Sequence, residues 1–324
     1  MAKLVGVLNT GHVWIHRPIE EWEAVRRSRR LRDDVPLEDM SEKQAKYDRV
    51  SAAVEILKSK LAEMRPDALI VYGDDQSENF ANTFVNIPSI AVYVGETFAG
   101  RRYNGAKGEA HQVVPNNTAL ATSILTSLLG SGFDPAFCMG LPNPERGIGH
   151  AIMNPLGYFT DYTIPTVPIL LNALFAPQVT GKRAHELGKA VRHAIEAYPE
   201  DLRVVAIGSG GLWHTTSHGY DTYLNEEFDR AGLKLLADGN LASWARHFDD
   251  YHVPDGDMSQ FIGERRDDMT GMPTLGGPQF GTRETLNWIA ASSMADGCPF
   301  TVVDYVPIYS SPIGSTYAYC DAVS

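Results

Sequence analysis

Three carboxylates lie within five positions of the segment VYGDDQSENF (71–80), directly after a run of apolar residues. They are Asp74, Asp75 and Glu78. Like charges this close repel one another unless a positive charge lies among them. A solvated acidic turn is the simplest interpretation of such a run. A bound cation is the other interpretation, and it requires further metal-binding side chains elsewhere in the chain.

Histidines that could complete such a site follow apolar or glycine-rich segments. His12 comes after the apolar run LVGVLN, His150 lies in RGIGHAIMNP, and His214 ends the segment GSGGLWH (208–214). Glycines let the backbone turn sharply and approach a ligand closely, so this last segment presents His214 to a ligand. Glu284 opens the segment ETLNW near the start of a predicted helix. Imidazole and carboxylate groups with open coordination positions are typical of a site for one divalent metal, such as non-haem iron.

The predicted elements bring two of these groups together. Apolar runs predict strands over 4–9 and 68–73, and a helical pattern over 41–64 lies between them, with Ser41 as its N-cap and Pro66 as its stop signal. A strand, helix and strand in this order form a right-handed crossover, so both strands end at the same edge of the sheet. Ligands of open α/β sheets bind at that edge. His12 and the acidic segment are therefore expected to be neighbours in space.

The remaining pattern predicts further helices and strands around the same sheet. Helices are predicted over 118–130, 181–198, 225–239 and 281–297, and strands over 300–309 and the run that ends at Gly208. Residues 165–174 are predicted to be a strand or another buried run. No internal repeat or linker interrupts the chain, although its length would allow either one large domain or two ordinary ones.

Composition excludes several classes of protein. The 324 residues are 44% hydrophobic and 21% charged, which is typical of a soluble globular protein, and the net charge of −12 disfavours nucleic acid and anionic membranes. The basic run 26–32 is expected to pair with the acids that follow it, namely Asp33, Asp34, Glu38 and Asp39. The three cysteines have no CxxC spacing and are expected to be ordinary buried thiols. The start of the chain lacks a basic leader and a cleavage site, which predicts a cytoplasmic protein.

Several motifs carry a resemblance to a known family. They are TGH after the first strand, VYGDD after the second, GH at 149–150, GSGGLWH at 208–214, NEEFD at 225–229 and ETLNW at 284–288. The motifs occur in this order over nearly the whole chain, which resembles the class III extradiol ring-cleavage dioxygenases, the family of the protocatechuate 4,5-dioxygenase catalytic subunit.

The resemblance implies a fold, a cofactor and a reaction. The implied fold is α/β, with a central mixed sheet flanked by helices, in a single catalytic domain over 1–324. Fe(II) would be held by two histidines and a glutamate, of which the first histidine falls on His12 and the glutamate on Glu284. His214 matches the acid–base histidine of the family. His150 matches a histidine that helps to deprotonate or orient the substrate. The implied partners are O2 and a catechol-like, aminophenol-like or hydroxypyridine-like aromatic substrate, and a homo-oligomer is expected.

The second metal ligand departs from the family pattern. The family has a histidine where this chain has Asp75. A His–Asp–Glu set would neutralise a dication more fully than His–His–Glu and would also suit Mn(II) or Mg(II). Two alternatives therefore stand beside the dioxygenase. One is a metal-dependent hydrolase or lyase that does not use O2, and the other is a binding protein without metal. Trp14 and Trp213 are candidates for lining an aromatic pocket.

Overall fold

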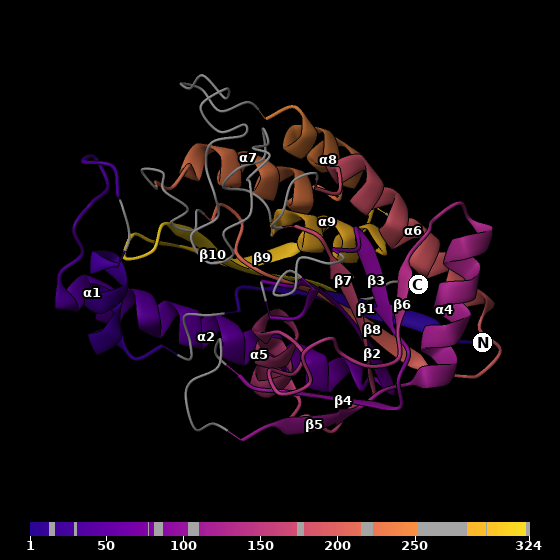
Figure 1. Cartoon of the computed structure of the whole chain (residues 1–324). Coiled ribbons are helices and arrows are strands. Elements are labelled where there is room, and N and C mark those ends of the chain that lie inside the picture. The colour runs from indigo at the N-terminus through magenta and orange to yellow at the C-terminus, as the bar shows by residue number, and fades with distance from the viewer. Residues whose placement is uncertain are drawn as a thin grey trace.

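A computed structural model of the chain describes residues 1–12, 17–28, 31–76, 78–80, 87–102, 110–173, 178–214, 223–251, 284–295 and 297–321. In these ranges the apolar runs form one mixed sheet of eight strands in the order β6-β3-β7-β2-β8-β1-β10-β9 (Figure 1). The strands are β1 (Lys3–Thr10), β2 (Ala68–Asp74), β3 (Ile90–Tyr93), β6 (Ala136–Cys138), β7 (Thr166–Leu171), β8 (Arg203–Ser209), β9 (Thr301–Ile308) and β10 (Ile313–Asp321). The α/β class and the central mixed sheet are confirmed.

Parallel pairing gives four strands a common carboxyl edge. β1 pairs with β8, β8 with β2, and β2 with β7, all in parallel. β8, which contains the predicted run that ends at Gly208, therefore lies between β1 and β2. β1 and β2 still end at the same edge of the sheet, as predicted. β3 pairs antiparallel with β7, and β10 pairs antiparallel with both β1 and β9. His12 and His214 lie in the segments that follow β1 and β8, while Asp74 is the last residue of β2 and Asp75 and Glu78 lie just beyond it.

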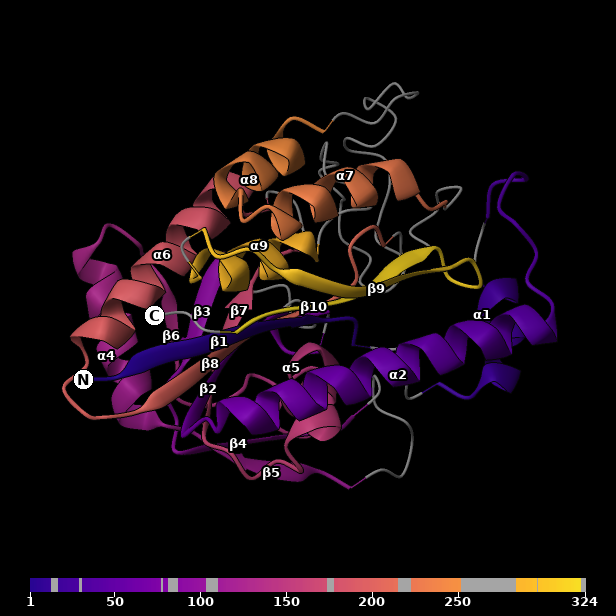
Figure 2. The same ribbon diagram turned by 180° about the vertical axis from the view of Figure 1, so that it is seen from behind.

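Helices cover both faces of this sheet (Figures 1 and 2). One face carries α4 (Thr118–Gly130), α6 (Gly181–Ala197), α7 (Glu226–Ala237), α8 (Leu241–Asp249) and α9 (Thr285–Ser293). The other carries α1 (Ile19–Arg27), α2 (Met40–Met64), α5 (His150–Phe159) and the hairpin of β4 (Thr97–Gly100) and β5 (Gln112–Pro115). The predicted helices and strands are confirmed, except that residue 174 of one predicted strand and residues 281–283 and 296 of the last predicted helix lie outside the described ranges. Within those ranges, no helix is long and apolar enough to cross a bilayer.

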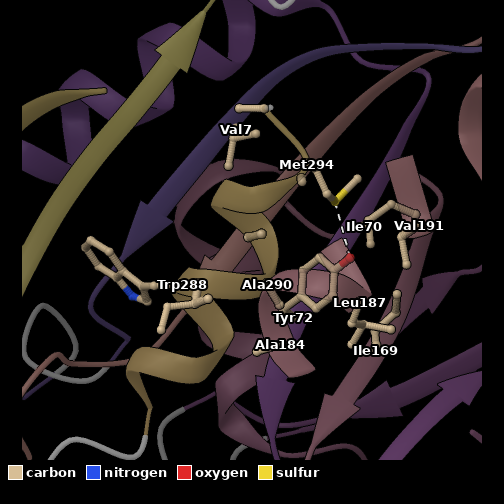
Figure 3. Packing of buried hydrophobic residues seen from close by; sticks show 14 of the residues in the cluster. Val7, Ile70, Tyr72, Ile169, Ala184, Leu187, Val191, Trp288, Ala290 and Met294 are labelled. Atoms are coloured by element: carbon tan, nitrogen blue, oxygen red, sulfur yellow. Dashed lines mark hydrogen bonds between the residues drawn. The ribbon is translucent and has the colours of Figure 1, made fainter. Parts of the chain in front are cut away.

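The core between the sheet, α6 and α9 fixes the position of the site. The Tyr72 hydroxyl of β2 donates to Met294 Sδ at 3.3 Å, among the apolar side chains of both helices (Figure 3). Gly188 of α6 allows this close packing, because a Cβ there would lie 2.1 Å from the carbonyl oxygen of Ala290. Every side chain of α9 is buried. Tight packing of this kind leaves α9 little freedom to shift against the sheet edge.

The start of α2 differs from the sequence prediction. Ser41 was the predicted N-cap, but Asp39 caps the helix in a reciprocal capping box with Glu42. The Asp39 carboxylate accepts the Glu42 N–H at 2.9 Å, and the Glu42 carboxylate accepts the Asp39 N–H at 2.8 Å. A capping box satisfies two helix-end donors at once, so it is preferred over a single serine. The predicted end before Pro66 is confirmed.

The basic run pairs with the following acids only in part. Arg32 forms an ion pair with Asp34, as predicted. Glu38 instead accepts from Lys46 at 2.6 Å and from the backbone N–H groups of Tyr309 and Ser310. These contacts tie the start of α2 to the turn between β9 and β10.

Two of the three cysteines form a disulfide, so the prediction of ordinary thiols is wrong for them. Cys298 and Cys320 are joined with a Cα–Cα separation of 6.7 Å, and Cys138 is free and buried. Their spacing in sequence gives no sign of this pairing. It arises because β9 and β10 are antiparallel neighbours, which brings the start of one strand beside the end of the other.

Thiol titration of the unfolded protein tests this pairing. Without reductant we expect one reactive thiol per chain, and with reductant three. Because the disulfide closes a loop of 22 residues, Cys298→Ser should lower the free energy of unfolding by about 3 kcal/mol under oxidising conditions. Under reducing conditions the variant and the native chain should differ much less. Three thiols without reductant would contradict the disulfide.

Candidate active site

His12 stands directly beyond β1 with its ring buried at the sheet edge, 2% exposed. Its Nδ1 lies 3.0 Å from the hydroxyl oxygen of Ser209, the last residue of the neighbouring strand β8. Its Nε2 lies 3.8 Å from Glu284 Oε1. The contact with Ser209 therefore orients the ring so that Nε2 faces the glutamate.

Glu284 immediately precedes α9 and is held by two loops at the same edge. Its Oε2 accepts the backbone N–H of Gly211 at 2.6 Å, and its Oε1 accepts the side-chain amide of Gln76 at 2.5 Å. Glu284 as a whole is only 4% exposed. Charge-assisted hydrogen bonds from donors fixed in two separate loops hold a buried carboxylate firmly in place. Gln76 was not singled out from the sequence, and its place next to Asp75 was the only available signal.

His150 is the first residue of α5, and its ring meets the edge of the His12 ring at a centroid distance of 4.9 Å. Its Nδ1 lies 2.6 Å from Glu78 Oε1. Burial lowers the pKa of His150, but Glu78, Asp74 and Glu284 outweigh burial, and the net pKa is raised. The charge of His150 in turn offsets the effect of burial on Glu78, whose pKa is lowered. His150 and Glu78 thus form a buried ion pair.

The net pKa change at His12 is opposite to that at His150. Burial, then the charges of His150 and His214, lower the pKa of His12 well below its usual value. A neutral imidazole is the form that binds metal ions. The same effect indicates that His214 lies near this ring, beyond the end of β8, where its backbone bridges to Ile313 of β10. The structure therefore brings His12, His150, His214 and Glu284 into one neighbourhood.

The three carboxylates of the opening segment have different partners. Asp74 is 1% exposed, accepts from the Asn287 side chain at 3.2 Å, and has its pKa raised to about 6, chiefly by burial. Asp75 accepts the backbone N–H of Asn79 at 2.8 Å. It also lines a small pocket with Phe80, Ile87, Pro88, Leu170, Leu171 and Asn172. None of the other expected ligands lines that pocket, so these contacts do not bring Asp75 to His12 and Glu284.

The residues present fit a metal ion in part. His12 Nε2 and Glu284 Oε1 are close enough to become two ligands of one cation, and both are buried. Among the described residues, however, no group of three or more histidine, cysteine, aspartate or glutamate side chains has the arrangement of a metal site. Asp75 as the third ligand stays a prediction.

Asp229 supports the loop that carries His214. Its Oδ1 accepts the Trp213 backbone N–H at 2.8 Å, and its Oδ2 accepts the Tyr305 hydroxyl at 2.9 Å. Burial raises its pKa to about 8, although these two hydrogen bonds oppose the change. Asp229 ends the segment NEEFD (225–229), and the sequence pattern alone gave no role for its carboxylate. Trp213 is itself buried against the rings of Tyr223, Phe228 and Tyr251, and Trp14 lies outside the described residues.

Comparison with known proteins gives a family match and several partial relatives. The family model "Catalytic LigB subunit of aromatic ring-opening dioxygenase" matches residues 35–253. This range includes Asp75, His150 and His214 but not His12 or Glu284.

Among the relatives, gallate dioxygenase of Pseudomonas putida is 32% identical over 38% of this chain and 36% of its own length. 2,3-Dihydroxyphenylpropionate/2,3-dihydroxicinnamic acid 1,2-dioxygenases of Photorhabdus laumondii and Rhodococcus jostii are 29% and 28% identical, over 49% and 53% of this chain and 46% and 51% of their own lengths. The chain thus spans about half or less of the length of these relatives. A solved structure, that of uncharacterized protein JW3007 from Escherichia coli K12, matches with a TM-score of 0.49 and 15% identity, over 98% of this chain and 99% of that one.

The raised pKa of Asp229 predicts a pH-dependent stability. The folded chain keeps this carboxyl protonated up to about pH 8, whereas the unfolded chain ionises it near pH 4. The contribution of the Asp229 carboxyl to the free energy of unfolding is therefore fully present below about pH 4 and is lost as the pH rises through about 8. Asp229→Asn mimics the protonated acid, so its unfolding free energy should exceed that of the native chain by a few kcal/mol at pH 9 and by little at pH 4.

Urea unfolding over this pH range measures the difference. Glu227→Gln is the matched control, because it removes an exposed carboxylate of the same helix. Parallel pH profiles for Asp229→Asn and the native chain would contradict the raised pKa.

Proposed function

Because the chain belongs to the family of the catalytic LigB subunit of aromatic ring-opening dioxygenases, we propose that it opens an aromatic ring with O2 in the extradiol manner. The substrate would carry two adjacent ring substituents that can bind a metal, as catechols, aminophenols and hydroxypyridines do. The convergence of His12, His150, His214 and Glu284 at the carboxyl edge of the sheet is the observation that supports this proposal. Both atoms of O2 enter the product, and the ring supplies the electrons, so no separate reductant is required.

In this proposal Fe(II) is held by His12 and Glu284, with Asp75 as the third ligand. When bound there, the ion would supply open coordination positions for the ring oxygens and for O2. The neutral imidazole of His12 suits this role, since it offers a lone pair without first losing a proton, and Glu284 Oε1 lies 3.8 Å from its Nε2. Asp75 already accepts from Asn79 through one oxygen, and a carboxylate can accept a hydrogen bond and bind a cation together.

The other two histidines take separate roles toward the substrate. His150, with its raised pKa and its Nδ1 bonded to Glu78, suits donation of a hydrogen bond to a ring oxygen that has lost its proton. His214 suits acid–base work, because an imidazole can accept a proton from a ring hydroxyl and return it near neutral pH. Asp229 holds the backbone next to His214, which keeps the distance between base and substrate constant.

Metal analysis and O2 uptake test the proposed function directly. Protein purified without oxygen should contain iron, and it should consume O2 with at least one member of a panel of catechols, gallates, aminophenols and hydroxypyridines. Tightly bound manganese or zinc without O2 uptake would instead favour a hydrolase or lyase that uses metal-bound water. No metal under any loading condition would favour a binding protein.

Two variants separate metal binding from turnover. Asp75→Ala should weaken Fe(II) binding by about tenfold or more, because loss of a ligand costs at least as much as loss of a residue that supports one. His214→Ala should keep the iron and lower kcat by about 10²–10⁴-fold, since it removes a proton-transfer group. Iron content by elemental analysis and kcat by O2 electrode measure both effects. Unchanged iron in Asp75→Ala would exclude it as a ligand, and full activity in His214→Ala would remove that residue from the mechanism.

A further inference from the structure

Glu78 is a buried carboxylate that the proposed reaction does not use directly. Glu78 is 3% exposed, and its Oε1 accepts two hydrogen bonds from one residue, His150. These are from the backbone N–H of His150 at 3.0 Å and from the ring Nδ1–H of His150 at 2.6 Å. The two bonds fix both the place where α5 begins and the rotation of the first side chain on it.

The first residue of α5 donates its backbone N–H to this carboxylate. The residue before the helix is Gly149, which has no side chain to cap it, so Glu78 supplies the missing acceptor from another segment. A negative group at this end also interacts favourably with the helix dipole. A Cβ on Gly149 would lie 2.0 Å from Glu78 Oε2, so the approach requires glycine.

Neighbouring residues hold Glu78 in place from both sides. The Asn79 side-chain amide donates to the Gly147 carbonyl at 2.8 Å, and its oxygen accepts the Asn143 N–H at 3.2 Å. Asp75 accepts the Asn79 N–H at the other end of the turn. The turn that carries Glu78 is thus tied to the loop that leads into α5, and the carboxylate has a fixed position relative to the His150 ring.

The orientation of the ring follows from these contacts. Because Nδ1 is bonded to Glu78, Nε2 is the nitrogen left to meet a ligand, and the ring already touches His12. We propose that Glu78 is a positioning residue that holds the His150 ring with Nε2 toward the substrate, an inference that rests on the ring-opening function proposed above. A plain helix cap would need only the bond to the backbone N–H, so the second bond to the ring is what distinguishes the two roles.

Three variants separate positioning from capping. Glu78→Ala removes both bonds and should lower kcat by about 10–100-fold, as loss of a group that orients an active-site histidine does, with little change in KM. Glu78→Gln should retain most of the activity, because its carboxamide oxygen can accept the same two N–H groups. Asn117→Ala is the matched control: it removes the N-cap acceptor of α4, a helix that carries none of the site residues, so it should lower Tm and leave kcat unchanged.

Nuclear magnetic resonance of the imidazole nitrogens gives a readout that does not depend on turnover. In protein labelled with the heavy nitrogen isotope at histidine, the His150 signals are assigned by their loss in His150→Phe. Nδ1 should carry a hydrogen-bonded proton in the native chain and in Glu78→Gln, and this proton signal should disappear in Glu78→Ala. The measurement uses metal-free protein, so it stands whether or not iron is the natural metal.

The outcomes distinguish failure of this inference from failure of the proposed function. O2 uptake that persists unchanged in Glu78→Ala would overturn the positioning role and leave the ring-opening function intact. Equal losses of kcat in Glu78→Ala and Asn117→Ala would also overturn it, because a general loss of stability would then explain the effect. A native Nδ1 without a proton would overturn the hydrogen bond itself. If no substrate supports O2 uptake, the proposed function fails, and the Nδ1 signal alone decides whether Glu78 orients the ring.

Discussion

Buried carboxylates at the carboxyl edge of the sheet are the constraint on which the site depends. A carboxylate withdrawn from water must find hydrogen-bond donors or a cation. Glu284 finds them in the Gly211 backbone and the Gln76 side chain, and Glu78 finds them in His150. In each case the acid and its donors come from different parts of the chain. The need to satisfy the acids therefore ties together the loops that follow separate strands.

The core beneath these loops makes their arrangement precise. α9 is buried on all sides and approaches α6 closely at Gly188, so the glutamate that precedes it has a fixed origin. Parallel pairing of β1, β8 and β2 brings His12 and Ser209 within hydrogen-bonding distance across adjacent strands. Rigid elements hold chemical groups in place better than loops do. In this protein His12, Gln76 and Glu284 each lie within two residues of the end of such an element.

The site also divides its histidines electrostatically. His12 has a hydroxyl as its partner and stays neutral, whereas His150 has a carboxylate and keeps its proton more firmly. Their rings are in contact, so one charge is tolerated there more easily than two. Under the proposed function, His12 would bind the metal and His150 would contact the substrate. This division follows from the partner of each ring, and the residue type alone would not reveal it.

The sequence by itself determined most strands of the sheet, most helices and the edge at which His12 and the acidic segment meet, because hydrophobic periodicity is a local property and the strand–helix–strand order is a topological one. It did not indicate β3, β6 and β10 or α1, α5 and α8. It also singled out His12, His150, His214 and Glu284. Tertiary structure decided what the sequence left open: the Cys298–Cys320 pairing and the separate partners of three adjacent acids. Side chains that are neighbours in sequence can point in different directions, and their partners lie on elements distant in the chain. Only the packed fold specifies those distances, and with them the charge that each group carries.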